Sequence, residues 1–253
     1  MLALQRHRQT LDVLEQENSV RVTALAKQFQ VTEETIRRDL EKLETDGKLV
    51  RSHGGAVRIE NAHRDIPFLQ RNITRIKEKT SIAKRALQEV SEADVIALDA
   101  STSAYQMARL LPDIAIHIIT NSLPIITLLE KREHIKVIAT GGLIDHNTQS
   151  LTGPLVDQAL DTYHINKFFF SCRGVDFQRG LSEAWEENAR YKQKLLALAD
   201  QSYLLADTSK LDVRSKIFFA KINDVDIIFT DTDLNEDQLK QLQNTETIIC
   251  PNT

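Results

Sequence analysis

The sequence lacks the features that define several large classes of proteins. Its two cysteines, Cys172 and Cys250, lie far apart and outside any Cys-x-x-Cys spacing, and its seven histidines are scattered. This usage excludes a disulfide framework and gives no sign of a metal site. The P-loop, Gly-x-Gly-x-x-Gly and Gly-x-Ser-x-Gly motifs are also missing. The common nucleotide-binding and hydrolase signatures are therefore absent, and no cofactor is expected.

Long apolar runs and an excess of positive charge are missing too. The first twenty residues include Arg6, Arg8 and Asp12, which leaves no apolar stretch for a signal peptide, and no later run has the length of a membrane span. The 32 Lys and Arg residues against 36 Asp and Glu give a net charge of −4, so any nucleic-acid-binding surface must be local. We expect a cytoplasmic globular protein without membrane contacts.

The front of the chain has the pattern of helices joined by short turns. The leucine spacing over residues 4–14 predicts a first helix that ends near Asn18. A second helix is predicted over residues 23–29, with Thr23 as its N-cap. A short turn then leads to a third helix, and the last two helices together predict a helix-turn-helix.

The third helix has clear start, burial and stop signals. Thr32 is the expected N-cap, Ile36, Leu40 and Leu43 recur at the spacing of a buried face, and Gly47 follows where the chain must leave the helix. A helix with one apolar face presents its other side chains to the outside. The sequence therefore predicts a helix backed by the core and open on its outer side.

The outer side of this third helix is polar and basic. Thr35, Arg38 and Lys42 point away from the buried face, and Arg37 lies on its flank. An exposed arginine on a recognition helix can donate to guanine O6 and N7, and threonine can bind a phosphate or a base edge. We predict that these residues contact double-stranded DNA, whereas Asp39 is expected to orient an arginine.

Residues 48–58 form two short strand-like runs around the Gly54-Gly55 dipeptide, which suits the positive φ angles of a tight hairpin. Such a hairpin would be the wing of a winged helix-turn-helix, with Arg51, His53 and Arg58 against phosphates or in a minor groove. A basic helix face is more often only a solvated surface. The order helix, turn, helix, basic face and hairpin within sixty residues favours DNA binding instead.

The rest of the chain alternates apolar strands with amphipathic helices, as α/β domains do. The predicted strands are residues 95–98, 116–120, 136–139, 167–171, 203–206, 217–219, 226–229 and 247–250. Residues 61–85 hold seven basic and two acidic side chains. We expect a DNA-binding domain over residues 1–60, a basic connector over 61–85, and an α/β domain over 86–253.

Polar or glycine-bearing segments follow several predicted strands. Because ligands of α/β proteins collect at the carboxyl edge of the sheet, these segments predict one binding cleft. The hydroxyls of residues 101–103 at a helix N-terminus suit a phosphate, although they could equally be simple helix caps. The candidate effector-binding residues are Asp99, Ser101, Thr102, Ser103, Asn121, Gly141, Gly174, Asp176, Asp207 and Lys210.

Two other residues are expected in the interior. A lone tryptophan is more often part of the core or a helix anchor than a ligand contact, so Trp185 is left out of the site. Cys172 follows an apolar run and has no activating neighbour in the sequence, so a small buried residue is expected rather than a nucleophile.

One string in the front segment resembles a known family signature. Thr35-Ile36-Arg37-Arg38-Asp39-Leu40, followed by Leu43, Gly47, Leu49, Arg51 and His53-Gly54-Gly55-Ala56, is similar to the signature of the DeoR family of bacterial sugar-operon regulators. The resemblance implies an N-terminal winged helix-turn-helix and an α/β effector domain similar to ribose-phosphate isomerases, which senses a phosphorylated sugar. The family's usual Gly-Thr-Thr phosphate loop is here Ser101-Thr102-Ser103.

Four effector-domain strings narrow the resemblance. Residues 97–101, 108–114, 120–122 and 170–176 are most similar to a family member that regulates fucose catabolism. That resemblance implies fuculose 1-phosphate as the effector.

Three functions follow from these patterns. The first is a sugar-responsive transcription factor, with no enzyme activity, that acts as a homo-oligomer, a dimer or tetramer, on paired half-sites. Effector binding would shift subunit geometry through the connector. The second is a sugar-phosphate isomerase with an appended DNA-binding module, with Asp99 or Asp176 as base beside Lys210. The third is an interaction protein whose winged helix binds protein.

Overall fold

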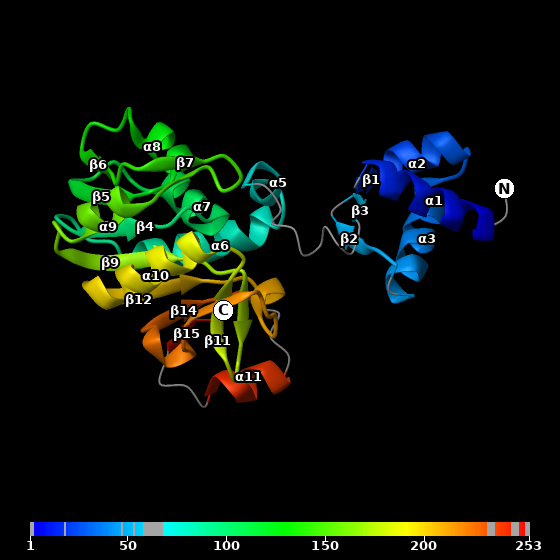
Figure 1. The fold of residues 1–253 in the computed structure, drawn as a ribbon. Helices are drawn as coiled ribbons and strands as arrows, with labels where there is room; N and C mark the ends of the chain where they lie inside the picture. The colour runs from blue at the N-terminus through cyan, green and yellow to red at the C-terminus, as the bar shows by residue number, and fades with distance from the viewer. Residues whose placement is uncertain are drawn as a thin grey trace. The chain divides into compact units, whose positions relative to one another are not determined.

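The computed structural model describes residues 3–17, 19–46, 48–52, 54–57, 68–231, 236–243 and 248–250. The chain divides into two compact units, Met1–Pro67 and Phe68–Thr253. Figure 1 shows a small helical unit at the amino end and a larger unit built around a sheet. None of the helices in the described part of the chain combines the length and apolarity that a membrane crossing requires.

The first unit is a helix-turn-helix with a small antiparallel sheet. Its elements are α1 (Ala3–Glu17), β1 (Ser19–Arg21), α2 (Val22–Phe29), α3 (Glu33–Thr45), β2 (Val50–Ser52) and β3 (Gly55–Val57). The sheet order is β1-β3-β2. Leu14, Leu25, Ile36, Leu40 and Leu43 form the core, so the predicted apolar spacings do face inward.

Local details confirm some predictions and correct others. The Thr32 hydroxyl accepts a hydrogen bond from the Thr35 amide at 3.2 Å, as expected of an N-cap. Thr23 is not a cap, because α2 already begins at Val22 after the extended residue Arg21. Strand β1 was not predicted; its three residues are too few for a periodic signal.

The two hairpin glycines have different roles. Gly54 lies in the turn with φ +81°, where glycine has no steric penalty. Gly55 pairs with Arg21 of β1, and a Cβ at this position would lie 1.8 Å from the Val20 carbonyl oxygen. Gly55 is therefore required for the close approach of β3 to β1 and not, as predicted, for a positive φ angle.

The second unit has seven strands in one sheet, which Figure 1 shows between layers of helices. The sheet order is β15-β14-β12-β9-β4-β5-β6, and its pairs are parallel. Its strands are β4 (Val95–Leu98), β5 (Ile116–Thr120), β6 (Ile135–Ala139), β9 (Ile165–Phe170), β12 (Ala199–Leu205), β14 (Ile227–Phe229) and β15 (Ile248–Cys250).

Helices connect these strands. They are α5 (Phe68–Asn72), α6 (Ile76–Ala86), α7 (Thr102–Leu110), α8 (Leu123–Leu129), α9 (Pro154–Leu160), α10 (Glu186–Leu198) and α11 (Glu236–Gln243), with short 3-10 helices η1 (Leu87–Glu89), η2 (Thr208–Lys210) and η3 (Ile222–Asp224). Two small antiparallel sheets complete the unit: β7 (Leu143–Asp145) with β8 (Ser150–Thr152), and β10 (Gly174–Asp176), β11 (Gly180–Glu183) and β13 (Ile217–Ala220).

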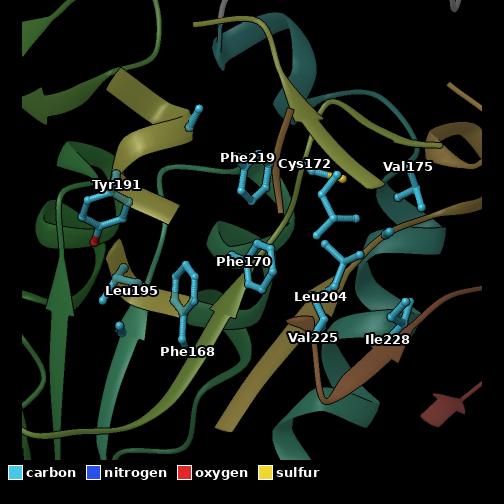
Figure 2. Close-up of a cluster of buried hydrophobic side chains, with 14 of the residues drawn as sticks. Phe168, Phe170, Cys172, Val175, Tyr191, Leu195, Leu204, Phe219, Val225 and Ile228 are labelled. Carbon is cyan, nitrogen blue, oxygen red and sulfur yellow. The ribbon is translucent and has the colours of Figure 1, made fainter. Parts of the chain in front are cut away.

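Successive side chains of the main-sheet strands point to opposite faces, and both faces are covered by helices. Phe169 of β9 packs in a cluster that includes residues of α6, α7 and α8. Phe168 and Phe170 face the other side, where Tyr191 and Leu195 of α10 pack (Figure 2). The near-continuous apolar runs in the sequence are thus explained by two-sided burial.

Two organisational predictions need correction. The residues of α5 and α6, expected in a connector, belong to the second unit, because Ile82 and Ala83 are fully buried in its core. Residues 61–67 lie outside the described residues. The predicted strand over residues 217–219 exists as β13, but it pairs antiparallel with β11 and not in the main sheet. The unpredicted strands β7, β8, β10 and β11 are short hairpin strands.

Candidate functional site

The outer face of α3 has the predicted composition. The side chains of Arg37, Arg38 and Lys42 are 51%, 78% and 63% exposed. Each is paired with an acidic residue four positions away on the same helix: Arg37 with Glu33 at 2.8 Å, Arg38 with Glu34 at 3.6 Å, and Lys42 with Asp46 at 3.0 Å. Exposed pairs of this kind contribute about 0.3–0.5 kcal/mol, so a phosphate can replace the carboxylates at little cost.

The other predicted DNA contacts lie around this face. The hydroxyl of Thr35, in the first turn of α3, forms a hydrogen bond of 2.9 Å with the hydroxyl of Thr32. Arg51 is exposed on β2, and its backbone amide donates to the Glu44 carboxylate at 2.8 Å, which joins the wing to α3. His53 and Arg58 lie outside the described residues.

Beneath α3, Asp39 forms a buried ion pair. Its carboxylate accepts from Arg6 Nε at 2.7 Å and bonds His7 Nε2 at 2.9 Å, both on α1. The prediction that Asp39 orients an arginine is confirmed. The contact fixes α1 against α3 from below, so the exposed arginines of α3 are carried on a rigid support.

In the second unit, Asp99 follows β4 and is fully engaged. Its carboxylate accepts hydrogen bonds from the amides of Ser101 at 3.2 Å and Ser171 at 3.3 Å, and Lys192 Nζ lies at 3.3 Å. Lys192 also pairs with Glu183 of β11. Burial raises the pKa of Asp99. The structure therefore brings Asp99 to the predicted edge, where it shapes the loop.

The next three residues begin α7. The Ser101 hydroxyl accepts from the Ala104 amide at 3.1 Å, so the alternative role as a helix cap holds for this residue. Thr102 and Ser103 are buried in the first turn of the helix. Neither of their hydroxyls makes a hydrogen bond to another residue in the described part of the chain.

Asp207 and Lys210 are brought together with residues that were not predicted. We define the cation cluster as Arg71, Arg75, Lys79, Arg173 and Lys210. Arg75 pairs with Asp207 at 2.9 Å and with Asp231 at 3.2 Å. Lys79 is 5% exposed, and its Nζ donates to the carbonyls of Arg71 at 2.7 Å and Thr74 at 2.8 Å.

The cation cluster holds more positive charge than its carboxylates balance. Burial, and then the charge of Lys210, lowers the pKa of Lys79 to about 8. Burial also lowers the pKa of Lys210, to which the charges of Arg173 and Arg71 add while Asp207 opposes them. Cations that are disfavoured in this way attract an anion.

The sequence analysis missed Arg71, Arg75 and Lys79 because it assigned them to a connector. The surplus of basic residues over residues 61–85 was the available signal. What the pattern could not show is that α5 packs against α7, and that α6 packs against α7 and β12, which brings Arg71 and Lys79 within electrostatic range of Lys210.

Three predicted effector residues, Asp176, Gly174 and Gly141, also have local structural roles. The Asp176 carboxylate accepts from the amides of Gln178 at 3.0 Å and Arg179 at 2.7 Å and pairs with Arg214, which lowers the pKa of Asp176. A Cβ on Gly174 would lie 2.3 Å from the Val213 carbonyl oxygen. Gly141 adopts φ +72° after β6. Gly174 follows Arg173 of the cation cluster directly, and Val175, between Gly174 and Asp176, is bridged to Leu211, the residue after Lys210.

Asn121, at the end of β5, lines a separate cavity. Its Nδ2 donates to the Leu151 carbonyl at 3.1 Å, and its Oδ1 is buried without a hydrogen-bond partner among the described residues. The cavity has a volume of about 290 Å³ and is otherwise formed by β8, α9 and α10. Asn121 was predicted to bind a ligand, but the surrounding residues were not.

The two residues expected in the interior differ. Cys172 is buried, as predicted, and burial raises the pKa of its thiol to about 12. Trp185 is 40% exposed next to Lys216, so it is not part of the core, which was one of the two roles expected for it. Among the described residues, no group of three or more His, Cys, Asp or Glu side chains is arranged to hold a metal ion.

Both carboxylates proposed as bases for the isomerase alternative are engaged in other contacts. Asp99 is held by two amides and Lys192, and Asp176 is closed into a turn and paired with Arg214. These contacts do not favour either carboxylate as a general base.

Comparisons with known proteins also divide the chain into two parts. A model of the DeoR-like helix-turn-helix domain matches residues 6–62, and a model of the DeoR C-terminal sensor domain matches residues 74–232. The sensor model includes α6, which supports its place in the second unit. Both parts of the predicted fold class, the helix-turn-helix and the α/β effector domain, are confirmed.

Individual relatives cover nearly the whole chain. The uncharacterized HTH-type transcriptional regulator YulB of Bacillus subtilis is 43% identical over 96% of this chain and 95% of its own length. The L-fucose operon activator of Escherichia coli is 39% identical over 89% and 94%. The higher identity to YulB overturns the expectation that the fucose regulator is the member this chain resembles most.

Solved structures give only a distant likeness. Ribose 5-phosphate isomerase A of Methanocaldococcus jannaschii has a TM-score of 0.40 and 20% identity over 53% of each chain, which is too low to support an inference about function. The two family models and the full-length relatives are decisive. This chain belongs to the DeoR family of helix-turn-helix transcriptional regulators.

Proposed function

We propose that this regulator controls a sugar-catabolic operon and that a phosphorylated sugar in the sensor domain governs its binding to operator DNA. The observation that carries the proposal is the cation cluster, in which buried Lys79 and half-buried Lys210 hold unbalanced positive charge at the carboxyl edge of the sheet. Buried cations with lowered pKa values mark a site that an anion completes.

The proposed phosphate position lies between the cation cluster and the start of α7. Helix α5, which carries Arg71, lies against α7: Gln106 Nε2 donates to Asn72 Oδ1 at 3.3 Å, and the Phe68 and Tyr105 rings are 5.7 Å apart. The hydroxyls of Thr102 and Ser103 and the amides of the first turn of α7 are suited to phosphate oxygens. Lys210 supplies the opposite charge.

The proposed DNA surface is the outer face of α3 with the wing. Thr35, Arg37, Arg38 and Lys42 would contact base edges and phosphates, and Arg51, with His53 and Arg58, would position the wing on the backbone. The exposed arginines and their weak pairs with Glu33 and Glu34 support this assignment.

Fuculose 1-phosphate is the proposed effector. The four resembling strings and the 39% identity to an L-fucose operon activator support this choice over other sugar phosphates. Thermal unfolding with a panel of sugar phosphates tests it, because a ligand that binds the folded chain raises the unfolding temperature. We expect fuculose 1-phosphate to give the largest rise. A larger rise with another sugar phosphate would reassign the pathway, and no rise with any would contradict the proposal.

A homo-oligomer, a dimer or a tetramer, is proposed because one recognition helix reads too few base pairs for adequate specificity. The β7–β8 hairpin supports self-association through the second unit, since Leu143 is 73% and Ile144 53% exposed. Light scattering after size-exclusion chromatography should give a multiple of the 28.7 kDa chain mass. A monomer at micromolar concentration would contradict this proposal.

A further inference from the structure

The wall of the Asn121 cavity is polar, and none of its residues belongs to the cation cluster. Asn121 is 3% exposed, and its Oδ1 has no hydrogen-bond donor among the described residues. A buried acceptor without a donor is unfavourable, because it has given up its hydrogen bonds to water. The Oδ1 atom is therefore available as an acceptor, and a hydroxyl or amine group would satisfy it.

The charge on the cavity wall excludes a phosphate. Asp157, Glu186 and Glu187 contribute carboxylates, and Arg190, the one lining cation, already pairs with Asp157 at 3.2 Å. Carboxylate and amide oxygens accept hydrogen bonds from sugar hydroxyls, whereas they repel phosphate oxygens. The cavity matches the uncharged part of a polyol.

The cavity adjoins the proposed phosphate position. Leu98 and Thr120 are paired across β4 and β5, so Asp99 and Asn121, the next residues, leave neighbouring strands that are about 4.8 Å apart. Tyr191, which also lines the cavity, donates its hydroxyl to the Leu98 carbonyl at 3.5 Å. The volume of about 290 Å³ is ample for the hydroxyl-bearing part of a monosaccharide.

We propose that the Asn121 cavity is the selectivity subsite of the sensor domain. It holds the uncharged, hydroxyl-bearing end of the effector, with a ligand hydroxyl donating to Asn121 Oδ1, while the phosphate remains at the cation cluster. This inference rests on the proposed function. The cation cluster then detects that a sugar is phosphorylated, and the Asn121 cavity detects which sugar it is.

Trp185 gives the experiment a built-in reporter. It is the single tryptophan of the chain, it is the N-cap of α10, and the next two residues, Glu186 and Glu187, line the cavity. Tryptophan fluorescence of the full chain is titrated with fuculose 1-phosphate, L-fucose and inorganic phosphate. The variants are Asn121→Leu, which removes the acceptor at similar volume, and Asn223→Leu, a matched change at an exposed position in η3.

The expected result is that the substitution lowers the affinity for the sugar part of the ligand but not the affinity for phosphate. Asn121→Leu should lower the affinity for fuculose 1-phosphate and for L-fucose at least tenfold and leave the affinity for inorganic phosphate within twofold of the wild type. Asn223→Leu should bind all three compounds as the wild type does. Equal affinity of Asn121→Leu and wild type for fuculose 1-phosphate would overturn the subsite, as would equal weakening of inorganic phosphate. Absence of binding by both phosphate compounds in the wild type would instead contradict the proposed function, and saturable L-fucose binding that depends on Asn121 would still support the subsite.

Unfolding curves keep the test interpretable. The leucine removes an oxygen that has no partner but also the Nδ2 donor to the Leu151 carbonyl, so Asn121→Leu should remain folded and unfold several degrees below the wild type. If it does not fold, Asn121→Asp retains an acceptor, adds a negative charge and should also bind L-fucose. Loss of L-fucose binding in Asn121→Asp would overturn the role of the acceptor.

Discussion

Charged side chains occupy opposite environments in the two units of this regulator. On α3, Arg37 and Arg38 are exposed and each pairs with a glutamate one turn away. In the cation cluster, Lys79 and Lys210 are largely withdrawn from solvent, and burial lowers the pKa of both. Little free energy is needed to break the exposed pairs on α3. In the cation cluster burial disfavours the positive charges, and a bound anion would offset this cost.

This difference suits the two tasks. A DNA reader gains from cations that exchange their partners quickly and respond to salt. A sensor gains from a site whose charge is balanced only when the ligand is bound, because ligand binding then changes the energy of the whole domain.

The largest effect is expected beneath α3. Asp39→Ala removes the carboxylate that Arg6 and His7 share and should lower the free energy of unfolding of the first unit by about 3 kcal/mol, as when a buried pair loses one partner. Denaturant unfolding measures it. The control Asp46→Ala breaks an exposed pair with Lys42 and should cost less than about 1 kcal/mol. Equal effects would mean that the Asp39 pair is no stronger than a surface pair.

The next effect concerns the sensor. Lys210→Met should weaken binding of a sugar phosphate by about 10- to 100-fold, because a hydrogen bond to a charged group contributes roughly 1.5–3 kcal/mol. Calorimetric titration measures the affinity. Lys216→Met, at an exposed position, should behave like the wild type. Undiminished affinity in Lys210→Met would remove this residue from the site.

On the DNA side, Arg38→Ala should weaken specific binding by about 1–3 kcal/mol and relax the choice of base at one position. Fluorescence anisotropy with matched and mismatched operators measures both. Lys27→Ala, on the exposed side of α2, is the control. An equal loss of affinity for all DNA sequences would indicate that Arg38 contacts a phosphate and not a base. A flat response to salt would favour the alternative in which the winged helix binds protein.

The smallest effect is a dependence on pH. Since burial lowers the pKa of Lys79 to about 8, an anion that prefers the charged lysine should bind with proton uptake, and its affinity should fall several-fold from pH 7 to 9. The ligand-free chain should respond oppositely: an unfolded lysine binds more protons between pH 8 and about 10.4, so the Lys79 contribution to stability rises with pH there.

Lys79→Arg, which stays charged, should abolish the fall in phosphate affinity. Titrations in buffers of different ionisation enthalpy count the protons taken up. Identical pH profiles for Lys79→Arg and wild type would assign the effect to another group.

The sequence predicted the α3 surface well because it is a local feature. Helical spacing alone places Ile36 and Leu40 inward and Arg38 outward, and the Thr32 cap depends only on residues within one turn. The parallel strands were predictable for a similar reason, since each is a continuous apolar run. Short hairpin strands such as β7 and β10 carry no such signal.

The sensor site was only partly predictable because its residues come from distant segments. Lys79 and Lys210 meet through the packing of α6 against the sheet, and no spacing rule links them. The contacts of Asp176 could not be predicted, because a carboxylate that closes a turn has the same sequence appearance as one that binds a ligand. Asn121 was predicted on its strand-end position, but its cavity depends on α10, which follows much later in the chain.

The most direct test is anisotropy of the DNA upstream of the regulator's own operon, titrated with wild-type protein at modest ionic strength, with and without fuculose 1-phosphate and the other sugar phosphates of the panel. The account predicts saturable binding whose affinity changes at least tenfold with one sugar phosphate, and loss of that change in a Lys79→Met, Lys210→Met double variant. An unchanged affinity with every sugar phosphate, or an equal response in the double variant, would contradict it.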